Sequence, residues 1–95
     1  MLTSKDRAAL RKIANTYTPV VIIGKESVTE AVVRDAENAI AARELIKCKV
    51  LESAGCSARD AADALAEAVG ADVVSVIGSK FVLYRRNEKK PVITF

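Results

Sequence analysis

Residues 20–30, with the sequence VVIIGKESVTE, decide the fold because a run of β-branched residues changes within a few positions into a helix start. Four β-branched residues in succession predict a fully buried strand. Gly24 gives the backbone the freedom for a sharp turn. Ser27 followed by Glu30 is typical of the capping box that opens a helix. The stretch therefore predicts a strand, a tight loop and a helix from about residue 28.

The predicted loop has the properties of an anion site. Its helix start holds about four backbone N–H groups without helical partners, at the positive end of the helix dipole. Lys25 adds a mobile positive charge beside them. A phosphate oxygen suits such a turn. The candidate binding residues of the loop are Gly24, Lys25, Glu26, Ser27, Val28 and Thr29.

Length and composition indicate one small domain over residues 1–95, of which 51% are apolar. No apolar run approaches the roughly 20 residues that a membrane-spanning helix needs. The N-terminus lacks the apolar core of a signal peptide. We therefore expect a cytoplasmic protein that does not bind a membrane. The net charge of +3 is by itself a weak sign of a polyanionic partner.

The composition argues against an enzyme, a metal site and a cofactor. The chain has no His for acid–base chemistry at neutral pH, and its two Cys cannot complete a metal ligand set. Cys48 lies in an apolar pattern and is expected in the core. The sequence GKES at 24–27 departs from a nucleotide-binding P-loop, which requires Ser or Thr directly after the lysine.

Periodicity and capping residues predict the other elements. A first helix begins at Thr3 or Ser4, and an alanine-rich helix begins after Ser57, each with a capping side chain. Gly78-Ser79 is a two-residue hairpin signal. Predicted helices span about 4–15, 28–42 and 57–69, predicted strands span 20–23, 45–51, 73–77 and 81–86, and residues 91–95 either dock as an edge strand or stay free.

The order helix, strand, helix, strand, helix, strand, strand predicts the fold class. Strands separated by helices favour parallel pairing, whereas the last two strands pair antiparallel across their hairpin. We therefore expect a compact two-layer α/β sandwich with a mixed four-stranded sheet and three helices. The period of two in the strand 45–51 places Lys47 and Lys49 on one face, so helices are expected to cover only half of the sheet.

Basic residues are concentrated in two parts of the sequence. The segment 80–90 holds five of them against one acid, and a second group lies at 43–49. Such segregation makes a one-sided positive field possible. Aromatic residues are scarce, so we expect binding to phosphates rather than stacking on bases. The basic candidates for polyanion contact are Arg43, Lys47, Lys49, Arg85 and Arg86.

Four motifs in order resemble the CRM domain, the chloroplast RNA splicing and ribosome maturation domain, whose stand-alone bacterial members are the YhbY-like proteins. The motifs are IIGK at 22–25, VTE at 28–30 with VV at 32–33, RELIKCKV at 43–50, and VIG at 76–78 with VLYR at 82–85. They cover nearly the whole chain. The segments ELIK and LYR are the most specific parts of this resemblance.

The resemblance implies an RNA-binding α/β domain that associates, in bacteria, with the precursor of the large ribosomal subunit during assembly. It also implies that a GxxG-type loop contacts RNA, and this loop maps to Gly24, Lys25, Glu26 and Ser27. Here Ser27 stands in place of the second glycine, and Glu26 puts a negative charge inside the loop.

Two functions follow as hypotheses. The leading hypothesis is a monomeric, non-enzymatic RNA-binding protein that acts on large-subunit ribosomal RNA precursors through the loop and the basic residues named above. The alternative is a protein-interaction module that binds its partner by strand addition, at the half-covered sheet or at the C-terminal edge formed by residues 92–95.

Overall fold

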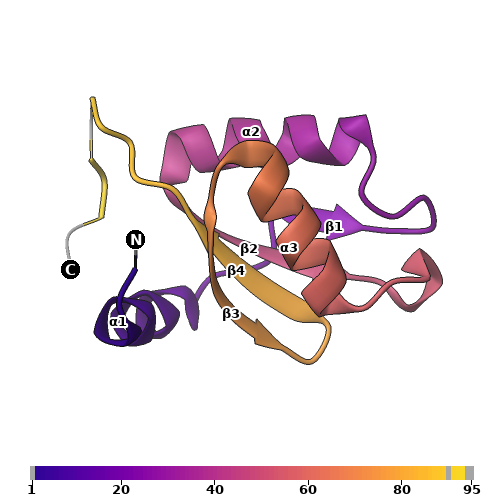
Figure 1. Ribbon diagram of the computed structural model, residues 1–95, viewed down its shortest axis with the longest axis horizontal. Coiled ribbons are helices and arrows are strands. Elements are labelled where there is room, and N and C mark those ends of the chain that lie inside the picture. Colours follow the sequence, from indigo (N-terminus) through magenta and orange to yellow (C-terminus); the bar gives the residue numbers. More distant parts are fainter. Residues whose placement is uncertain (1, 90, 94–95) are drawn as a thin grey trace.

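The computed structural model describes residues 2–89 and 91–93 and follows the predicted order of helices and strands (Figure 1). A short 3₁₀ turn, η1, is added between the second strand and the third helix. The elements are α1 (Ser4–Ala14), β1 (Val21–Ile23), α2 (Glu30–Arg43), β2 (Leu45–Val50), η1 (Glu52–Ala54), α3 (Ala58–Val69), β3 (Asp72–Ile77) and β4 (Lys80–Tyr84).

The strands form one mixed sheet in the order β1-β2-β4-β3. β1 pairs with β2 in parallel, and β4 pairs antiparallel with both β2 and β3. The predictions of a parallel pair across α2 and an antiparallel hairpin at the end are therefore confirmed. The last strand in the sequence lies inside the sheet, so β1 and β3 form its two edges.

Helices lie on both sides of the sheet, with α1 and α2 on opposite sides (Figure 1). α2 and α3 cover one face over a core that includes Ile40, Leu65 and Phe81. α1 packs on part of the other face, where Leu10 meets Val74, among other residues. No helix among the residues described is long and apolar enough to cross a membrane.

β1 is only half buried, and the prediction of a fully buried strand is wrong. Val21 and Ile23 lie in the core, whereas Ile22 is 48% exposed. The reason is that β1 is an edge strand, and α1 packs against β2 and β3 instead of covering it. The strand therefore leaves an apolar side chain on an open part of the sheet face.

Helix α2 starts later than predicted, and the expected capping box of Ser27 and Glu30 is wrong. The Thr29 side chain caps the helix by accepting a hydrogen bond from the backbone N–H of Val32 at 3.3 Å. Ser27 instead has a φ of 61° and belongs to the preceding turn, so the helix cannot begin directly after it. The caps of α1 at Thr3 and of α3 at Ser57 are as predicted.

Glu44 holds the segment that follows β4. Its side chain is fully buried, and its carboxylate accepts hydrogen bonds from the backbone N–H groups of Asn87, Val92 and Ile93 at 2.5, 2.6 and 2.7 Å. Residues 91–93 form no strand and are not free, so neither expectation for them holds. Residues 94 and 95, which belonged to the same prediction, lie outside the described residues.

The surroundings of Glu44 keep it ionised. Burial alone raises the pKa of the Glu44 carboxyl, but the three backbone donors and the nearby Arg86 charge more than offset this and lower the pKa below its usual value. Glu44 also has a φ of 65°, a conformation that favours glycine. A carboxylate at a strained position is therefore the anchor between α2 and the C-terminal segment.

Candidate nucleic-acid interface

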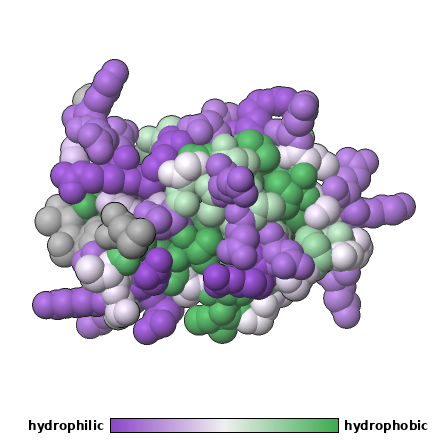
Figure 2. Space-filling model, viewed as in Figure 1, coloured by the Kyte–Doolittle hydropathy of each residue, from purple (hydrophilic) through white to green (hydrophobic). Residues whose placement is uncertain are grey.

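The loop between β1 and α2 is exposed at one end of the molecule. Lys25 and Glu26 are exposed, while the residues on either side of them are half-buried. The loop lies at the right-hand end of Figure 1, and hydrophilic side chains project from the same end in Figure 2. The predicted loop residues are therefore accessible to a large ligand.

The sharp turn in this loop is made by Ser27 and not by Gly24, so the predicted role of Gly24 is wrong. The Ser27 N–H donates to the Gly24 carbonyl at 2.8 Å, and Ser27 adopts the left-handed conformation. Gly24 has no positive φ, and a Cβ atom there would lie 3.8 Å from the Leu51 Cδ1 atom, an ordinary contact. The position that favours glycine on conformational grounds is the one occupied by serine.

A second loop supports the first. The Ser27 Oγ atom lies 3.2 Å from the Cys56 Sγ atom, and the Leu51 N–H donates to the Ile23 carbonyl at 2.9 Å. Cys56 immediately precedes Ser57, the cap of α3. The start of α2 and the start of α3 therefore lie at the same end of the molecule, joined through the contact of Ser27 with Cys56.

The charge at this end is mixed. Lys25 is accompanied along the same two loops and helix starts by the exposed carboxylates of Glu26, Glu30, Glu52 and Asp60. Backbone N–H groups at the two helix starts favour an anion, but these carboxylates oppose one. A strong positive field therefore has to come from elsewhere on the surface.

The open face of the sheet provides that charge. Burial alternates along β2 as predicted, with Ile46, Cys48 and Val50 buried and the two lysines between them half-exposed. Lys49 is paired with Lys80 of β4 on one side and lies beside Ile22 of β1 on the other. We call the side of the sheet that bears Lys47, Lys49 and Lys80 the lysine face.

The pairing of two lysines is informative because like charges directly opposite each other destabilise a sheet. Neither Lys49 nor Lys80 has a carboxylate partner within 4.0 Å among the described residues. A bound anion removes this repulsion. Lys49 also lines a hollow together with Cys56, which in turn contacts Ser27, so the lysine face continues toward the loop.

Arg43 and Lys47 are brought together as well. Both line a hollow of about 500 Å³ between the end of α2, the start of β2 and the connection from α1 to β1. Val92 of the segment held by Glu44 lines the same hollow. Arg43 therefore lies at the far end of the lysine face from the loop 24–29.

Arg85 and Arg86 do not join this surface. The Arg85 guanidinium donates to both carboxylate oxygens of Glu37 at 2.7 Å and to the Val69 carbonyl at 2.9 Å, on the side covered by α2 and α3. The hydrogen bond from Arg85 lowers the pKa of Glu37. Arg86 lies beside the end of α2, where it lines a hollow with Ala41 and Asn87. The structure thus gives Arg85 an internal partner.

Sequence reasoning missed two basic residues of the open face, Arg11 and Lys80. Arg11 is one of several scattered charges on the first helix, a pattern typical of a solvated surface, but it lines a hollow against the sheet together with Lys47 and Lys80. Lys80 was signalled by the alternation along the hairpin, since it lies two positions before Val82 on the same face. For Arg11 the sequence gives no such indication, because nothing in it shows on which side of the sheet α1 packs.

Comparison with known families matches residues 2–85 to the CRS1 / YhbY (CRM) domain. The chain is 34% identical over 93 residues to the Bacillus subtilis protein named "Probable RNA-binding protein YqeI", covering 98% of this chain and 97% of that protein. It is 33% identical over 91 residues to a Haemophilus influenzae protein named "RNA-binding protein", covering 96% and 92% of the two chains.

A solved structure is also similar. The solution structure of the Staphylococcus aureus protein SAV1595 superposes with a TM-score of 0.75 at 33% sequence identity, covering 90% of each chain. The fold with three helices and a mixed four-stranded sheet is therefore shared with this structure.

Proposed function

Because the chain belongs to the CRS1 / YhbY (CRM) domain family, we propose that it binds RNA and catalyses no reaction. The names of its relatives in Bacillus subtilis and Haemophilus influenzae support this proposal. The RNA we propose is the precursor of large-subunit ribosomal RNA, bound in the cytoplasm by a monomer during ribosome assembly. The loop of residues 24–29 and the lysine face provide the contacts.

The observation that carries the proposal is the register that places Lys49 opposite Lys80 on an open sheet face. This arrangement lowers stability in the free protein and is relieved by a polyanion. The lysine face continues through the hollow beside Cys56 to the loop. A nucleic-acid backbone is an extended polyanion that spans such a surface, whereas a single small anion occupies only one end.

Phosphate contacts account for most of the binding in this proposal. The loop offers backbone N–H groups and Lys25, and the lysine face offers Lys47, Lys49 and Lys80. Such contacts position the RNA but read little of its sequence. We therefore expect low base specificity and a strong dependence of affinity on salt concentration. Arg85 is left out of this interface because Glu37 already occupies its guanidinium.

The first test replaces Lys25 by alanine and measures affinity for a fragment of large-subunit ribosomal RNA precursor over a range of salt concentrations. Lys25→Ala should weaken binding similarly across RNA sequences and flatten the slope of log K against log salt by about 0.7 to 0.9. Lys89→Ala, which also removes an exposed charge but at the opposite end, is the matched control. Unchanged affinity and slope in Lys25→Ala would remove Lys25 from the interface.

The second test reverses two charges on the lysine face. The double variant Lys47→Glu with Lys49→Glu should no longer co-sediment with precursors of the large ribosomal subunit. Lys5→Glu with Lys89→Glu makes the same change of net charge elsewhere and should behave as wild type. Co-sedimentation of the first double variant at the wild-type level would show that the sheet surface is not the contact.

A protein-interaction module is the second candidate, favoured by the exposed edge strand β1 with Ile22 on its surface. Strand addition to such an edge is a known mode of peptide recognition. A pull-down with and without ribonuclease separates the two functions. Loss of ribosomal partners after ribonuclease treatment favours RNA contact, and their persistence favours protein contact.

A further inference from the structure

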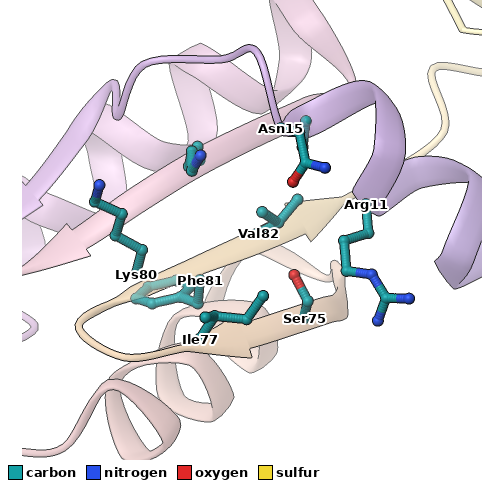
Figure 3. Close-up of a pocket in the computed structure, with 9 residues that line it drawn as sticks. Arg11, Asn15, Ser75, Ile77, Lys80, Phe81 and Val82 are labelled. Atoms are coloured by element: carbon teal, nitrogen blue, oxygen red, sulfur yellow. The ribbon is translucent and has the colours of Figure 1, made fainter.

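A hollow of about 190 Å³ lies between the end of α1 and the lysine face. Figure 3 shows labelled side chains from three parts of the chain around it: Arg11 of α1 with Asn15 at the helix C-cap, Ser75 and Ile77 of β3, and Lys80, Phe81 and Val82 of β4. The Arg11 and Lys80 side chains extend to opposite sides of the hollow (Figure 3). Lys47 of β2 also lines the hollow. None of the nine residues that line it belongs to the loop of residues 24–29.

The charge of this hollow is of one sign. Arg11, Lys47 and Lys80 line it, and no carboxylate does. In the part of the chain that the structure describes, none of these three side chains makes an ion pair or a side-chain hydrogen bond. Cations without partners that lie around one hollow complement a ligand with phosphate groups.

The hollow also has an apolar wall. Val82 is buried at its base, and Ile77 at its rim is 66% exposed and so accessible to a ligand. Ser75 and Asn15 add a hydroxyl and an amide beside this wall. A nucleotide matches this lining: the faces of its flat base suit the apolar wall, the polar edges of the base suit the hydroxyl and the amide, and its phosphates stay outside the hollow near the cations.

The size of the hollow limits the ligand to one such ring. Pockets that enclose a whole drug-sized molecule measure roughly 300–1,000 Å³. The smaller volume here suits one base, with its flanking phosphates outside and within reach of the basic side chains. An unpaired base of a single strand can be turned out in this way, whereas a base within a duplex must first lose its pairing and stacking, at a cost of a few kcal/mol.

The hollow is continuous with the proposed RNA-binding loop. Lys80 is paired with Lys49, which lies beside Ile22, and Ile22 is one residue from the end of β1. Neighbouring strands are about 4.8 Å apart, so this row of residues spans roughly 10 Å across the sheet. One RNA strand can therefore contact the loop and reach the hollow along the row.

We propose that the hollow between α1 and the lysine face holds one unpaired nucleotide of the bound RNA. The base lies against Ile77 and Val82, and the flanking phosphates contact Arg11, Lys47 and Lys80. This inference rests on the proposed function, because it specifies where and how the same RNA is contacted. It adds a preference for a single-stranded segment next to the part bound by the loop.

The test uses a short oligouridylate as the probe and measures affinity as a function of salt. Arg11→Ala with Lys80→Ala should weaken binding roughly two- to thirtyfold, the range for two exposed charge pairs. It should also flatten the salt slope by about 1.4, which corresponds to two single-strand contacts. Lys12→Ala with Lys89→Ala removes two exposed charges outside the hollow and should leave both quantities unchanged.

A second variant tests the apolar contact with the base without changing the charge of the protein. Ile77→Ser alters an exposed side chain, so the fold is retained, and it should weaken binding of oligouridylate but not of an abasic ribose-phosphate strand. In amide NMR spectra, the signals of Ser75 and Val82 should shift on addition of oligouridylate. If inorganic phosphate alone reproduces these shifts, the hollow is only an anion site and the inference is wrong.

The outcomes separate the inference from the proposed function. If the Arg11 with Lys80 variant binds oligouridylate as wild type does while Lys25→Ala still weakens RNA binding, the inference is overturned and the proposed function stands. If the wild-type protein binds neither oligouridylate nor the ribosomal fragment, both are overturned. Weakened binding in both the charge variant and Ile77→Ser supports the nucleotide site.

Discussion

Replacing Glu44 by glutamine is the sharpest test of how this domain is held together. The carboxylate accepts backbone N–H groups on both oxygens: Asn87 donates to Oε2, and Val92 and Ile93 donate to Oε1. A glutamine can keep one oxygen toward Val92 and Ile93. Its amide NH₂ then faces the N–H of Asn87, so that a donor meets a donor.

The magnitude follows from these contacts. Leaving one buried donor unsatisfied costs about 1–3 kcal/mol, and the loss of charge weakens the two hydrogen bonds that remain. We therefore expect Glu44→Gln to lower the free energy of unfolding by about 2 kcal/mol. For a domain of this size that corresponds to a fall of roughly 8–16 °C in the midpoint of thermal unfolding.

The dependence on pH has a defined sign. The pKa of Glu44 is lowered in the folded protein, so its contribution is complete above the unfolded value of about 4.3. It is lost as the pH falls through the folded pKa. The difference between wild type and Glu44→Gln should therefore be largest near pH 7, a value at which the carboxylate is fully ionised, and should shrink below about pH 4.

The assay is urea unfolding followed by circular dichroism at several pH values. Comparing Glu44→Ala with Glu44→Gly separates the contribution of the carboxylate to stability from that of the backbone conformation. Gly normally costs about 0.5–1 kcal/mol more than Ala within a helix, but at a φ of 65° the glycine variant should be at least as stable. A Glu44→Gln variant within about 0.5 kcal/mol of wild type at pH 7 would refute the role given to this anchor.

Three further predictions concern other parts of the molecule. Ser27→Gly should raise the free energy of unfolding by about 0.5–1 kcal/mol, because Ser27 has a φ of 61°; urea unfolding that shows a loss instead would mean that the contact with Cys56 outweighs the strain. Arg85→Ala should lower the free energy of unfolding by about 1–2 kcal/mol, because it removes the hydrogen bond to Val69 and the ion pair with Glu37, which is weakened by the 47% exposure of the Glu37 side chain. It should leave RNA affinity unchanged, and weaker RNA binding at equal stability would return Arg85 to the interface. A thiol reagent should modify Cys56 in the native protein and spare Cys48, whose pKa burial raises to about 12; equal rates for the two thiols before unfolding would contradict this.

The elements that the sequence predicted well are those set by neighbours in the chain. The caps at Thr3 and Ser57 and the hairpin at 78–79 depend on side chains a few residues apart. The alternation along β2 depends on a period of two. Each of these signals is complete within a single element, so no knowledge of the tertiary structure is needed.

What the sequence could not predict depends on residues far apart. Glu44 follows a surface arginine and gives no sign that its partners lie 43, 48 and 49 residues away. Ile22 is exposed because β4, and not β1, is placed inside the sheet. Ser27 was the expected cap of α2, and only its backbone conformation shows that Thr29, two residues later, takes this role.

The candidate interface divides in the same way. Lys47 and Lys49 were found from their alternation, and Lys25 from its loop. Arg11 required knowledge of which side of the sheet α1 covers, and Arg85 required knowledge of its ion pair with Glu37. The surroundings of a residue could therefore not be predicted from the sequence where they depend on the packing of one element against another.

The position of β4 has a consequence for biosynthesis. Among the described strands β4 comes last in the sequence, yet it contributes all the hydrogen-bonded neighbours of β3 and one of the two neighbours of β2. A nascent chain that ends before Tyr84 can pair β1 with β2, but it leaves β3 without a sheet to join. Productive folding of this sheet therefore waits until β4 has left the exit tunnel, and a chain cut before β4 would have unpaired strand edges.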